Sequence, residues 1–281
     1  PAATEAPAAT EAAKDFSEMT IEELKPLIET ITDGKLTMVT SPDFAPYEFY
    51  ALDEAGNPSL AGFDIALGKY IADFIGLELE VIPMDFDGTI TELGMGSADI
   101  GMAGYSPDPE REKAMSFSTV YYTGGQSFVC HQDNKDAFAA LTDANKAEYQ
   151  IGAQIGSIQA DLAHTNTPDA DIVELSKVTD IVMELSTGKL DAAFIETPGV
   201  QAYSNSYKNL QIACVIPQDD NGSVIGVYKG NEDLLKYVNE AINKCISDGT
   251  FAQYVAKAVD LAAGDTYQGT LDENGNVPTG E

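Results

Sequence analysis

The feature that most constrains this fold is an alternation of strand-like and helix-like segments that starts twice along the chain. KLTMVT, LELEVIPM and ADIGMA have the pattern of short strands, and GFDIALGKYIADFIG has that of an amphipathic helix. Near residue 150 the alternation begins again, with the strand-like segments YQIGAQIG, ADIVELS and LDAAFIE, each followed by a helical pattern. Strands alternating with helices predict α/β lobes with mainly parallel sheets, and the second start predicts two of them.

The length and the charge of the chain support this organisation and exclude some partners. Two lobes fit 281 residues, because domains average roughly 100–200 residues. Asp and Glu outnumber Lys and Arg by 46 to 15, for a formal net charge of −31. Such a surface repels phosphate backbones, so we expect no nucleic-acid partner. The longest apolar runs are far shorter than the roughly 20 residues of a membrane span, so we expect the chain as given to be soluble.

Cysteine and histidine offer little material for metal or redox chemistry. The three cysteines, Cys130, Cys214 and Cys245, have no CxxC spacing, and the two histidines, His131 and His164, lie far apart. We expect no metal, no cofactor and no catalytic residues. The cysteines are best interpreted as small buried apolar residues. A bridge between Cys130 and Cys214 is the alternative.

Both ends of the chain differ from the region between them. Residues 1–16 begin with PAATEA written twice, which predicts a flexible acidic tether. Residues 17–32 carry a capping-box pattern, Thr20 to Glu23, and predict a short docking helix that Pro26 can kink. Residues 266–281 are rich in Gly, Asn and Asp and predict a loose tail. No charged and apolar leader is present, so we expect any signal peptide to have been removed.

Nine short strings resemble the amino-acid solute-binding proteins of ABC transporters, the bacterial extracellular family 3. They occur in the family's order and span about residues 34–255. The strings are TSPDFAPYEF (40–49), GFDIAL (62–67), MDFDGTI (84–90), ADIGMAGYSPDPERE (98–112), FSTVYY (117–122), IGAQIGSIQ (151–159), LDAAFIETP (190–198), GVYKG (226–230) and DGTFAQY (248–254).

The resemblance implies the type II periplasmic-binding-protein fold, an α/β architecture of two Rossmann-like lobes with a hinge of two crossovers. Lobe 1 is expected at 33–129 plus 217–265, and lobe 2 at 130–216. Bending is expected near 129–132 and 216–221. The resemblance also implies that the chain returns to lobe 1 after completing lobe 2.

The function that the resemblance implies is that of an extracytoplasmic receptor, not an enzyme. It would bind a free L-amino acid in the cleft, close on it and deliver it to an ABC permease for import. We expect a monomeric lipoprotein on the surface of a Gram-positive bacterium, or a periplasmic protein. A lipid anchor upstream of Pro1 would hold it to the membrane.

The resemblance also implies a charged clamp for a zwitterion. Arg111 is expected to bind the ligand α-carboxylate, because a guanidinium offers two parallel N–H donors. Without the family, a surface arginine paired with Glu110 or Glu112 would be the default interpretation. Glu196 is expected to bind the ammonium, at a position where most relatives have aspartate. Its alternative is an acid at a helix N-terminus.

Backbone groups are expected to complete this clamp. Ser106 would contact the carboxylate and the ammonium, and the Gly104 carbonyl would accept from the ammonium; at Ala103 and Gly104 many relatives carry serines. The backbone N–H groups of Ser157 and Ile158 open a helix and would bind the carboxylate. Isoleucine at 158 removes a hydroxyl contact that relatives have. The alternative for Ser157 is a simple helix cap.

The ligand side chain is expected to lie between two rings, Phe44 and Phe86, for which core packing is the alternative. Gln154 is expected to reach the same side chain. Ser41 stands where some relatives that take arginine or lysine have an acid, so we expect a neutral ligand side chain. Three acids close in sequence could reverse this preference: Asp43, Asp85 and Asp87.

Two alternative functions remain open from the sequence. The same clamp can serve a chemoreceptor or a signalling kinase, and the ligand chemistry would be identical. Some members of this fold class are dehydratases, which need a general acid or base in the pocket. Glu196 is the pocket acid that the sequence places, and it already has a binding role.

Overall fold

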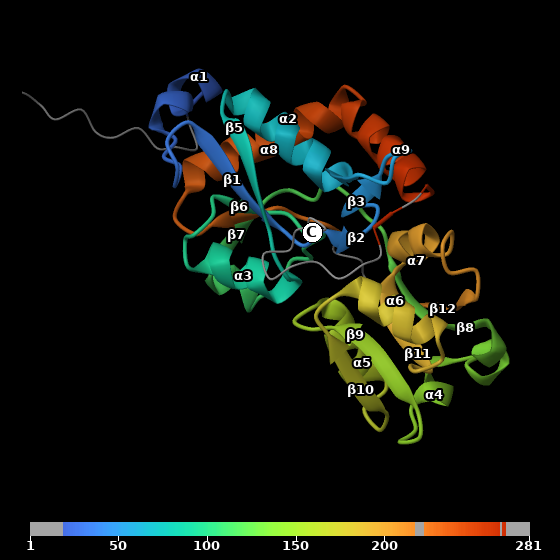
Figure 1. Cartoon of the computed structure of the whole chain (residues 1–281). Coiled ribbons are helices and arrows are strands. Elements are labelled where there is room, and N and C mark those ends of the chain that lie inside the picture. Colours follow the sequence, from blue (N-terminus) through green and yellow to red (C-terminus); the bar gives the residue numbers. More distant parts are fainter. Residues whose placement is uncertain (1–18, 217–221, 265, 268–281) are drawn as a thin grey trace, which may run out of the picture.

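The computed structural model describes residues 19–216, 222–264 and 266–267. Within that part, the chain forms two lobes, each built on a five-stranded sheet (Figure 1). The predicted α/β class is therefore confirmed. The expected tether at 1–16 lies outside the described residues, as does the expected tail except for residues 266 and 267.

The sheet of the first lobe has the strand order β5-β1-β6-β13-β7. Its strands are β1 (Lys35–Thr40), β5 (Glu78–Pro83), β6 (Ile100–Gly101), β7 (Met115–Phe117) and β13 (Gly226–Tyr228). β1 pairs in parallel with β5 and β6, whereas β13 pairs antiparallel with β6 and β7. The chain thus returns to the first sheet after completing the second.

Helices cover the first sheet where apolar periodicity predicts them. They are α2 (Phe63–Ile75), α3 (Phe86–Gly94), α8 (Glu232–Ser247) and α9 (Thr250–Ala262). The predicted break between α8 and α9 is confirmed, because Gly249 has a φ of +79°, a conformation that favours glycine. Figure 1 shows α2, α8 and α9 on one side of this sheet.

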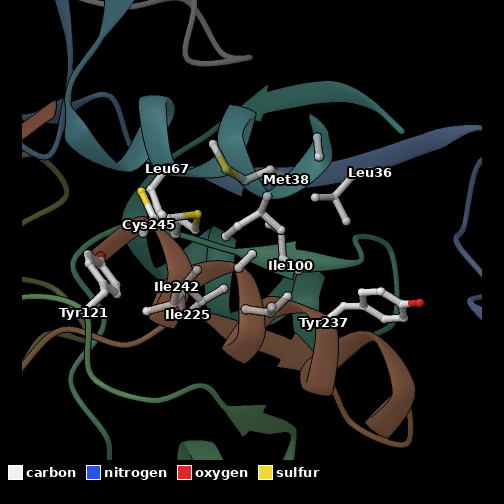
Figure 2. Packing of buried hydrophobic residues seen from close by; sticks show 14 of the residues in the cluster. Leu36, Met38, Leu67, Ile100, Tyr121, Ile225, Tyr237, Ile242 and Cys245 are labelled. Carbon is white, nitrogen blue, oxygen red and sulfur yellow. The ribbon is translucent and has the colours of Figure 1, made fainter. Parts of the chain in front are cut away.

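The core of the first lobe joins segments that are far apart in sequence. Leu36 and Met38 of β1 pack with Leu67 of α2, and Ile242 and Cys245 of α8 belong to the same cluster (Figure 2). All five side chains are fully buried. Because α2 and α8 share this core, the segment that follows the second lobe stabilises the first lobe.

The sheet of the second lobe has the order β10-β9-β11-β8-β12. Its strands are β8 (Gln126–His131), β9 (Gln150–Gln154), β10 (Asp171–Leu175), β11 (Ala192–Glu196) and β12 (Leu210–Ile216). Its helices are η4 (Gln132–Ala137), α4 (Leu141–Ala144), α5 (Ile158–Asn166), α6 (Val178–Ser186) and α7 (Thr197–Tyr203). β9, β10 and β11 are parallel to one another, and β8 runs antiparallel to β11 and β12.

A small three-stranded sheet lies between the two lobes. It contains β2 (Asp43–Phe44), β3 (Glu48–Leu52) and β4 (Pro58–Ala61). Its residues Tyr47 and Phe49 belong to different cores: Tyr47 packs in the core of the first lobe and Phe49 in a core of the second. This sheet, called the β2–β4 hairpin sheet below, therefore contacts both lobes.

The first crossover differs from the expected position. β8 begins at Gln126 and belongs entirely to the second sheet, so the lobe boundary precedes the expected 129–130. Ser223 N donates to Tyr122 O at 2.7 Å, which brings the two connections together just before β8. Of the two expected bending segments, 129–132 lies within β8 and η4, and most of 216–221 lies outside the described residues.

The expected docking helix is shorter than the segment 17–32. It consists of α1 (Ile21–Leu24) and η2 (Lys25–Leu27), and the second of these contains Pro26. The Glu23 carboxylate accepts from the backbone of Thr20 at 3.0 Å, as the capping pattern predicts. No helix in the described part of the chain is long and apolar enough to cross a membrane.

Candidate ligand-binding site

A pocket lies between the two lobes, beside the β2–β4 hairpin sheet. Its volume is about 560 Å³, including the open solvent at its mouth. Its wall combines residues of the first lobe with residues of β8, β9, α5, α6 and β11 from the second. Nine of the ten residues predicted for the site line this pocket: Ser41, Phe44, Phe86, Gly104, Ser106, Arg111, Gln154, Ile158 and Glu196.

Arg111 reaches across the pocket from the first lobe to the second. It opens the short helix η3 (Arg111–Lys113). Its Nη1 donates to the carbonyl of Ser106 at 3.1 Å, and its Nη2 donates to the carbonyl of Gly156 at 2.9 Å. Glu110 pairs with Lys113 instead of with Arg111.

The electrostatic setting of Arg111 suits an anion. Burial lowers the pKa of Arg111, although a guanidinium stays charged in proteins. Two carbonyls occupy two of its five N–H donors, and among the described residues it forms no ion pair. The pocket therefore contains a fixed cation that an incoming carboxylate can neutralise.

The backbone of Gly104 lies against the ring of Phe44. Its φ is +58°, and a Cβ at this position would lie 2.8 Å from Phe44 Cε1. Its N–H donates to Oδ2 of Asp64 at 3.3 Å. The Phe44 ring therefore leaves no room for a side chain at position 104.

Glu196 supplies the acid of the second lobe. It ends β11 and is 5% exposed. Its side chain does not cap α7; its Oε1 accepts from the hydroxyl of Tyr47 at 2.6 Å. Tyr47 precedes β3, so this hydrogen bond joins the second lobe to the β2–β4 hairpin sheet.

The start of α5 forms part of the second-lobe wall, but Ser157 does not line the pocket. The Ser157 side chain caps α5, accepting from Ala160 N at 3.3 Å. Its backbone N–H donates to Gln154 O at 3.2 Å, so the expected bond to a ligand carboxylate would compete with that turn. Ile158 and the Gln154 side chain do face the pocket.

The two predicted aromatic residues lie on the pocket wall. Phe44 stacks on Tyr47, with ring centres 4.7 Å apart. Phe86 meets Tyr105 edge-on at 5.9 Å, and the Arg111 guanidinium lies 5.6 Å from the centre of the Phe86 ring. Each ring is thus held by a tyrosine behind it, which leaves a rigid apolar surface toward the pocket.

Ser41 is joined to a buried acid. Its hydroxyl donates to Oδ1 of Asp43 at 2.6 Å, and the other carboxylate oxygen accepts from Val178 N at 2.5 Å. Burial raises the pKa of Asp43 to about 6. Because the Ser41 hydrogen points to Asp43, the oxygen of Ser41 presents lone pairs to its other neighbours.

The sequence analysis missed two acids at this site, Glu48 and Asp64. Glu48 lines the pocket, and both side chains are fully buried. Burial, with Asp64 beside it, raises the pKa of Glu48 well above its usual range, and burial raises the pKa of Asp64 to about 7. The signal in the sequence was an acid within an otherwise apolar string, Glu48 in PYEF and Asp64 in GFDIAL, which can indicate a buried carboxyl group.

Further pocket residues were also missed. Gln159 Nε2 donates to Gln126 Oε1 at 2.8 Å, which joins α5 to β8 on the pocket wall. Gln154, which was predicted, is fixed beside them, because its Nε2 donates to Ser176 O at 3.0 Å. The remaining lining residues that were not predicted are Ala103, Val178, Ile181, Phe194 and Ile195.

Comparisons with known proteins agree on one family. The sequence model of the bacterial extracellular solute-binding proteins, family 3, matches residues 36–260. The arginine-binding extracellular protein ArtP of Bacillus subtilis (strain 168) is 33% identical over 220 residues, covering 76% of this chain and 82% of that protein.

Solved structures resemble this fold over most of its length. One is an amino acid ABC transporter substrate-binding protein from Streptococcus pneumoniae Canada MDR_19A bound to L-arginine, with a TM-score of 0.76 and 31% identity. It covers 85% of this chain and 97% of its own. Another is an ancestral arginine-binding protein bound to glutamine, with a TM-score of 0.71, 31% identity, and coverage of 80% and 98%.

Proposed function

Because this chain belongs to the bacterial extracellular solute-binding proteins, family 3, we propose that it binds a free L-amino acid between its lobes and delivers it to an ABC permease for import. One observation carries the proposal. A single pocket holds the cation Arg111 from the first lobe and the buried acid Glu196 from the second. Its relatives are named as binding proteins, and we assign this chain binding and no reaction.

The chemistry of a free amino acid fits these two groups. Taking its carboxylate and its ammonium out of water costs several kcal/mol for each ion unless both are paired well. Arg111 offers N–H donors to the carboxylate, and Glu196 offers a charge to the ammonium. Gly104 and Ser106 line the same pocket, and their carbonyl, N–H and hydroxyl groups can accept or donate the remaining hydrogen bonds.

Closure follows from the division of the site between the lobes. A ligand that touches both lobes binds the closed form more tightly and shifts the population towards it. A micromolar ligand supplies about 8 kcal/mol, enough to shift a two-state equilibrium from mostly open to mostly closed. The permease would then recognise the closed form.

The location of the protein and its partners outside the pocket are inferred from the family. The family is extracellular, so we assign this chain to the outer side of the cytoplasmic membrane. We propose that a lipid anchor upstream of Pro1 holds it there and that it acts as a monomer on a Gram-positive cell. A globomycin-sensitive shift in mass of the native protein would test the anchor.

Two classes of ligand side chain are supported by different observations. The serine at position 41 supports a neutral side chain, because it supplies no charge of its own. The hydrogen bond from Ser41 to Asp43 supports a side chain rich in N–H donors, including a cationic one, because it turns a lone pair of Ser41 outward with a carboxylate behind it. Arginine and glutamine, both rich in N–H donors, are the ligands of the two similar structures.

A thermal-shift screen against the twenty L-amino acids tests this proposal. A ligand at a hundred times its Kd stabilises the folded protein by about 2.7 kcal/mol. We expect one or a few amino acids to raise the melting temperature, and D-enantiomers to have little effect. A flat response to all twenty would contradict the proposed function.

A further inference from the structure

The carboxyl group of Glu48 has an unusual position for an acid. It is fully buried, and among the described residues no donor reaches either of its oxygens. The same side chain lines the pocket between the lobes. A buried ionised carboxylate without donors is strongly unfavourable, so Glu48 must be neutral or must receive donors from something that enters the pocket.

Asp64 provides the partner for a neutral Glu48. The two carboxyl groups lie against each other, and Asp64 accepts the hydrogen bond when Glu48 carries the proton. Asp64 is otherwise well supplied with donors: the Tyr121 hydroxyl at 2.8 and 2.9 Å from its two oxygens, and Gly104 N at 3.3 Å. The donor set therefore favours charge on Asp64 and the proton on Glu48.

The other titratable groups around Glu48 favour the same state. Asp43 of β2 and Glu196 of β11 are acids that act on it electrostatically. Three tyrosines also interact with it electrostatically: Tyr105, Tyr121 and Tyr203. Arg111 is the cation of the pocket wall, and it is bound to carbonyls instead of to Glu48.

Glu48 lines the pocket close to groups that suit an ammonium. Asp64 is joined to the backbone of Gly104, whose carbonyl belongs to the same wall, and Glu196 is close enough to act on Glu48. An ammonium placed there supplies both N–H donors and a positive charge. Each of these stabilises an ionised Glu48.

We propose that Glu48 and Asp64 share one proton in the unliganded pocket, and that Glu48 releases this proton to solvent when the ammonium of an amino acid binds beside it. The O–H bond of Glu48 breaks, the carboxylate keeps the electron pair, and the proton passes to buffer. The inference rests on the proposed function and adds Glu48, together with Asp64, to the acid Glu196 of the site. Ligand binding is then coupled to proton release.

Isothermal titration calorimetry measures this coupling. The ligand is the L-amino acid that raises the melting temperature most in the screen, titrated at pH 7 in phosphate, HEPES and Tris, which differ in ionisation enthalpy. We expect close to one proton released per ligand bound. Between pH 6 and 7, Kd should then fall nearly tenfold.

Glu48→Gln identifies the source of the proton. The glutamine keeps the shape, so we expect it to fold and to bind with a proton release close to zero and a flat pH profile. Glu54→Gln, in the exposed turn after β3, is the matched control and should release as many protons as the wild type.

Infrared difference spectroscopy of the wild type provides a second measurement that needs no variant. Ligand binding should remove the carbonyl band of a protonated carboxyl group. The inference is overturned if the wild type binds its ligand with no proton release and no loss of this band, or if Glu48→Gln releases as many protons as the wild type. The proposed function fails separately, through the absence of any amino acid that binds.

Discussion

The positive and the negative groups of the pocket are stabilised in different ways. At one end, Arg111 is a permanent cation whose donors are held by two backbone carbonyls, one from each lobe. At the other end, the acids Glu48, Asp64 and Glu196 are all buried, and Glu48 and Asp64 form no ion pair within the described part of the chain. The positive end is stabilised by dipoles, and the negative end by tyrosine hydroxyls and a shared proton.

This difference follows from the chemistry of the side chains. A guanidinium cannot lose its proton in a protein, so it must be solvated by acceptors. Carboxyl groups can become neutral, so several of them can be buried together at a modest cost. The acidic end can therefore adjust its charge to the ligand, whereas the Arg111 end cannot.

Loss of Arg111 should have the largest effect on binding. Arg111→Ala leaves a ligand carboxylate buried without its cation, and losing one partner of such a pair costs up to about 5 kcal/mol. We expect no thermal shift at ligand concentrations that saturate the wild type.

Lys113→Ala is the matched control for that variant. It removes a positive charge two residues further along η3, from a side chain that is largely exposed and paired with Glu110. Its ligand response should remain near that of the wild type. An equal loss in both variants would show that general attraction, and not a fixed contact at Arg111, drives binding.

Removing the charge of Glu196 should cost less than removing Arg111. Glu196→Gln keeps an acceptor for Tyr47 and for the ammonium, so we expect affinity to fall by about 3 kcal/mol, or roughly a hundredfold. Titration calorimetry gives the change. If affinity were unchanged, the other acids would neutralise the ammonium without Glu196.

The titration of Asp43 should make the unliganded protein less stable as the pH rises. Its pKa is raised from 3.8 to about 6 in the folded chain. Between these values the folded chain binds more protons than the unfolded chain, so the free energy of unfolding falls with rising pH. Denaturant unfolding at pH 4 and pH 7.5 should show a loss of stability to which Asp43 contributes on the order of 2 kcal/mol, and Asp43→Asn should reduce the loss by that contribution.

The exposed Asp136 supplies the control for this pH effect. Asp136→Asn should keep the slope of the wild type. Since Asp64 has a pKa raised to about 7, a further loss of stability should remain in Asp43→Asn and extend to higher pH. A wild type that gains stability across this range would contradict the buried arrangement of both acids.

The hydrogen bond between Tyr47 and Glu196 should have the smallest effect. Tyr47→Phe removes it and leaves the ring in place, which costs about 1 kcal/mol of binding, or roughly fivefold. Tyr228→Phe, at an exposed position on β13, should change affinity little. A gain of affinity in Tyr47→Phe would mean that the tyrosine competes with the ligand for Glu196.

Local patterns predicted much of the fold. The apolar spacing of 63–75, with Gly76 after it, predicted α2, and Asp248-Gly249 predicted the end of α8. The first crossover was misplaced, because the apolar run SFVC of β8 spans the expected boundary. Its membership in the second sheet depends on antiparallel pairing with β11 and β12, which lie more than 50 residues away.

Site residues were predicted where the residue type itself indicates a binding role, such as a charged side chain after a strand. Arg111 and Glu196 follow strand-like segments, and the family resemblance drew attention to both. Asp64 was missed because no local pattern places its partners Tyr121 and Gly104 beside it, and Glu48 was missed because its burial next to Asp64 depends on the tertiary fold. An acid in an apolar string appears the same in the sequence whether its carboxyl group faces water or a core.

The β2–β4 hairpin sheet has a consequence for how the protein melts. Ala45 and Phe49 pack in a core of the second lobe, whereas Tyr47 packs in that of the first, and Asp64 N donates to Tyr47 O at 3.0 Å. Loss of either core removes half of the support of this sheet and exposes apolar surface on the other. Differential scanning calorimetry should therefore show one cooperative endotherm for both lobes, although each has its own sheet.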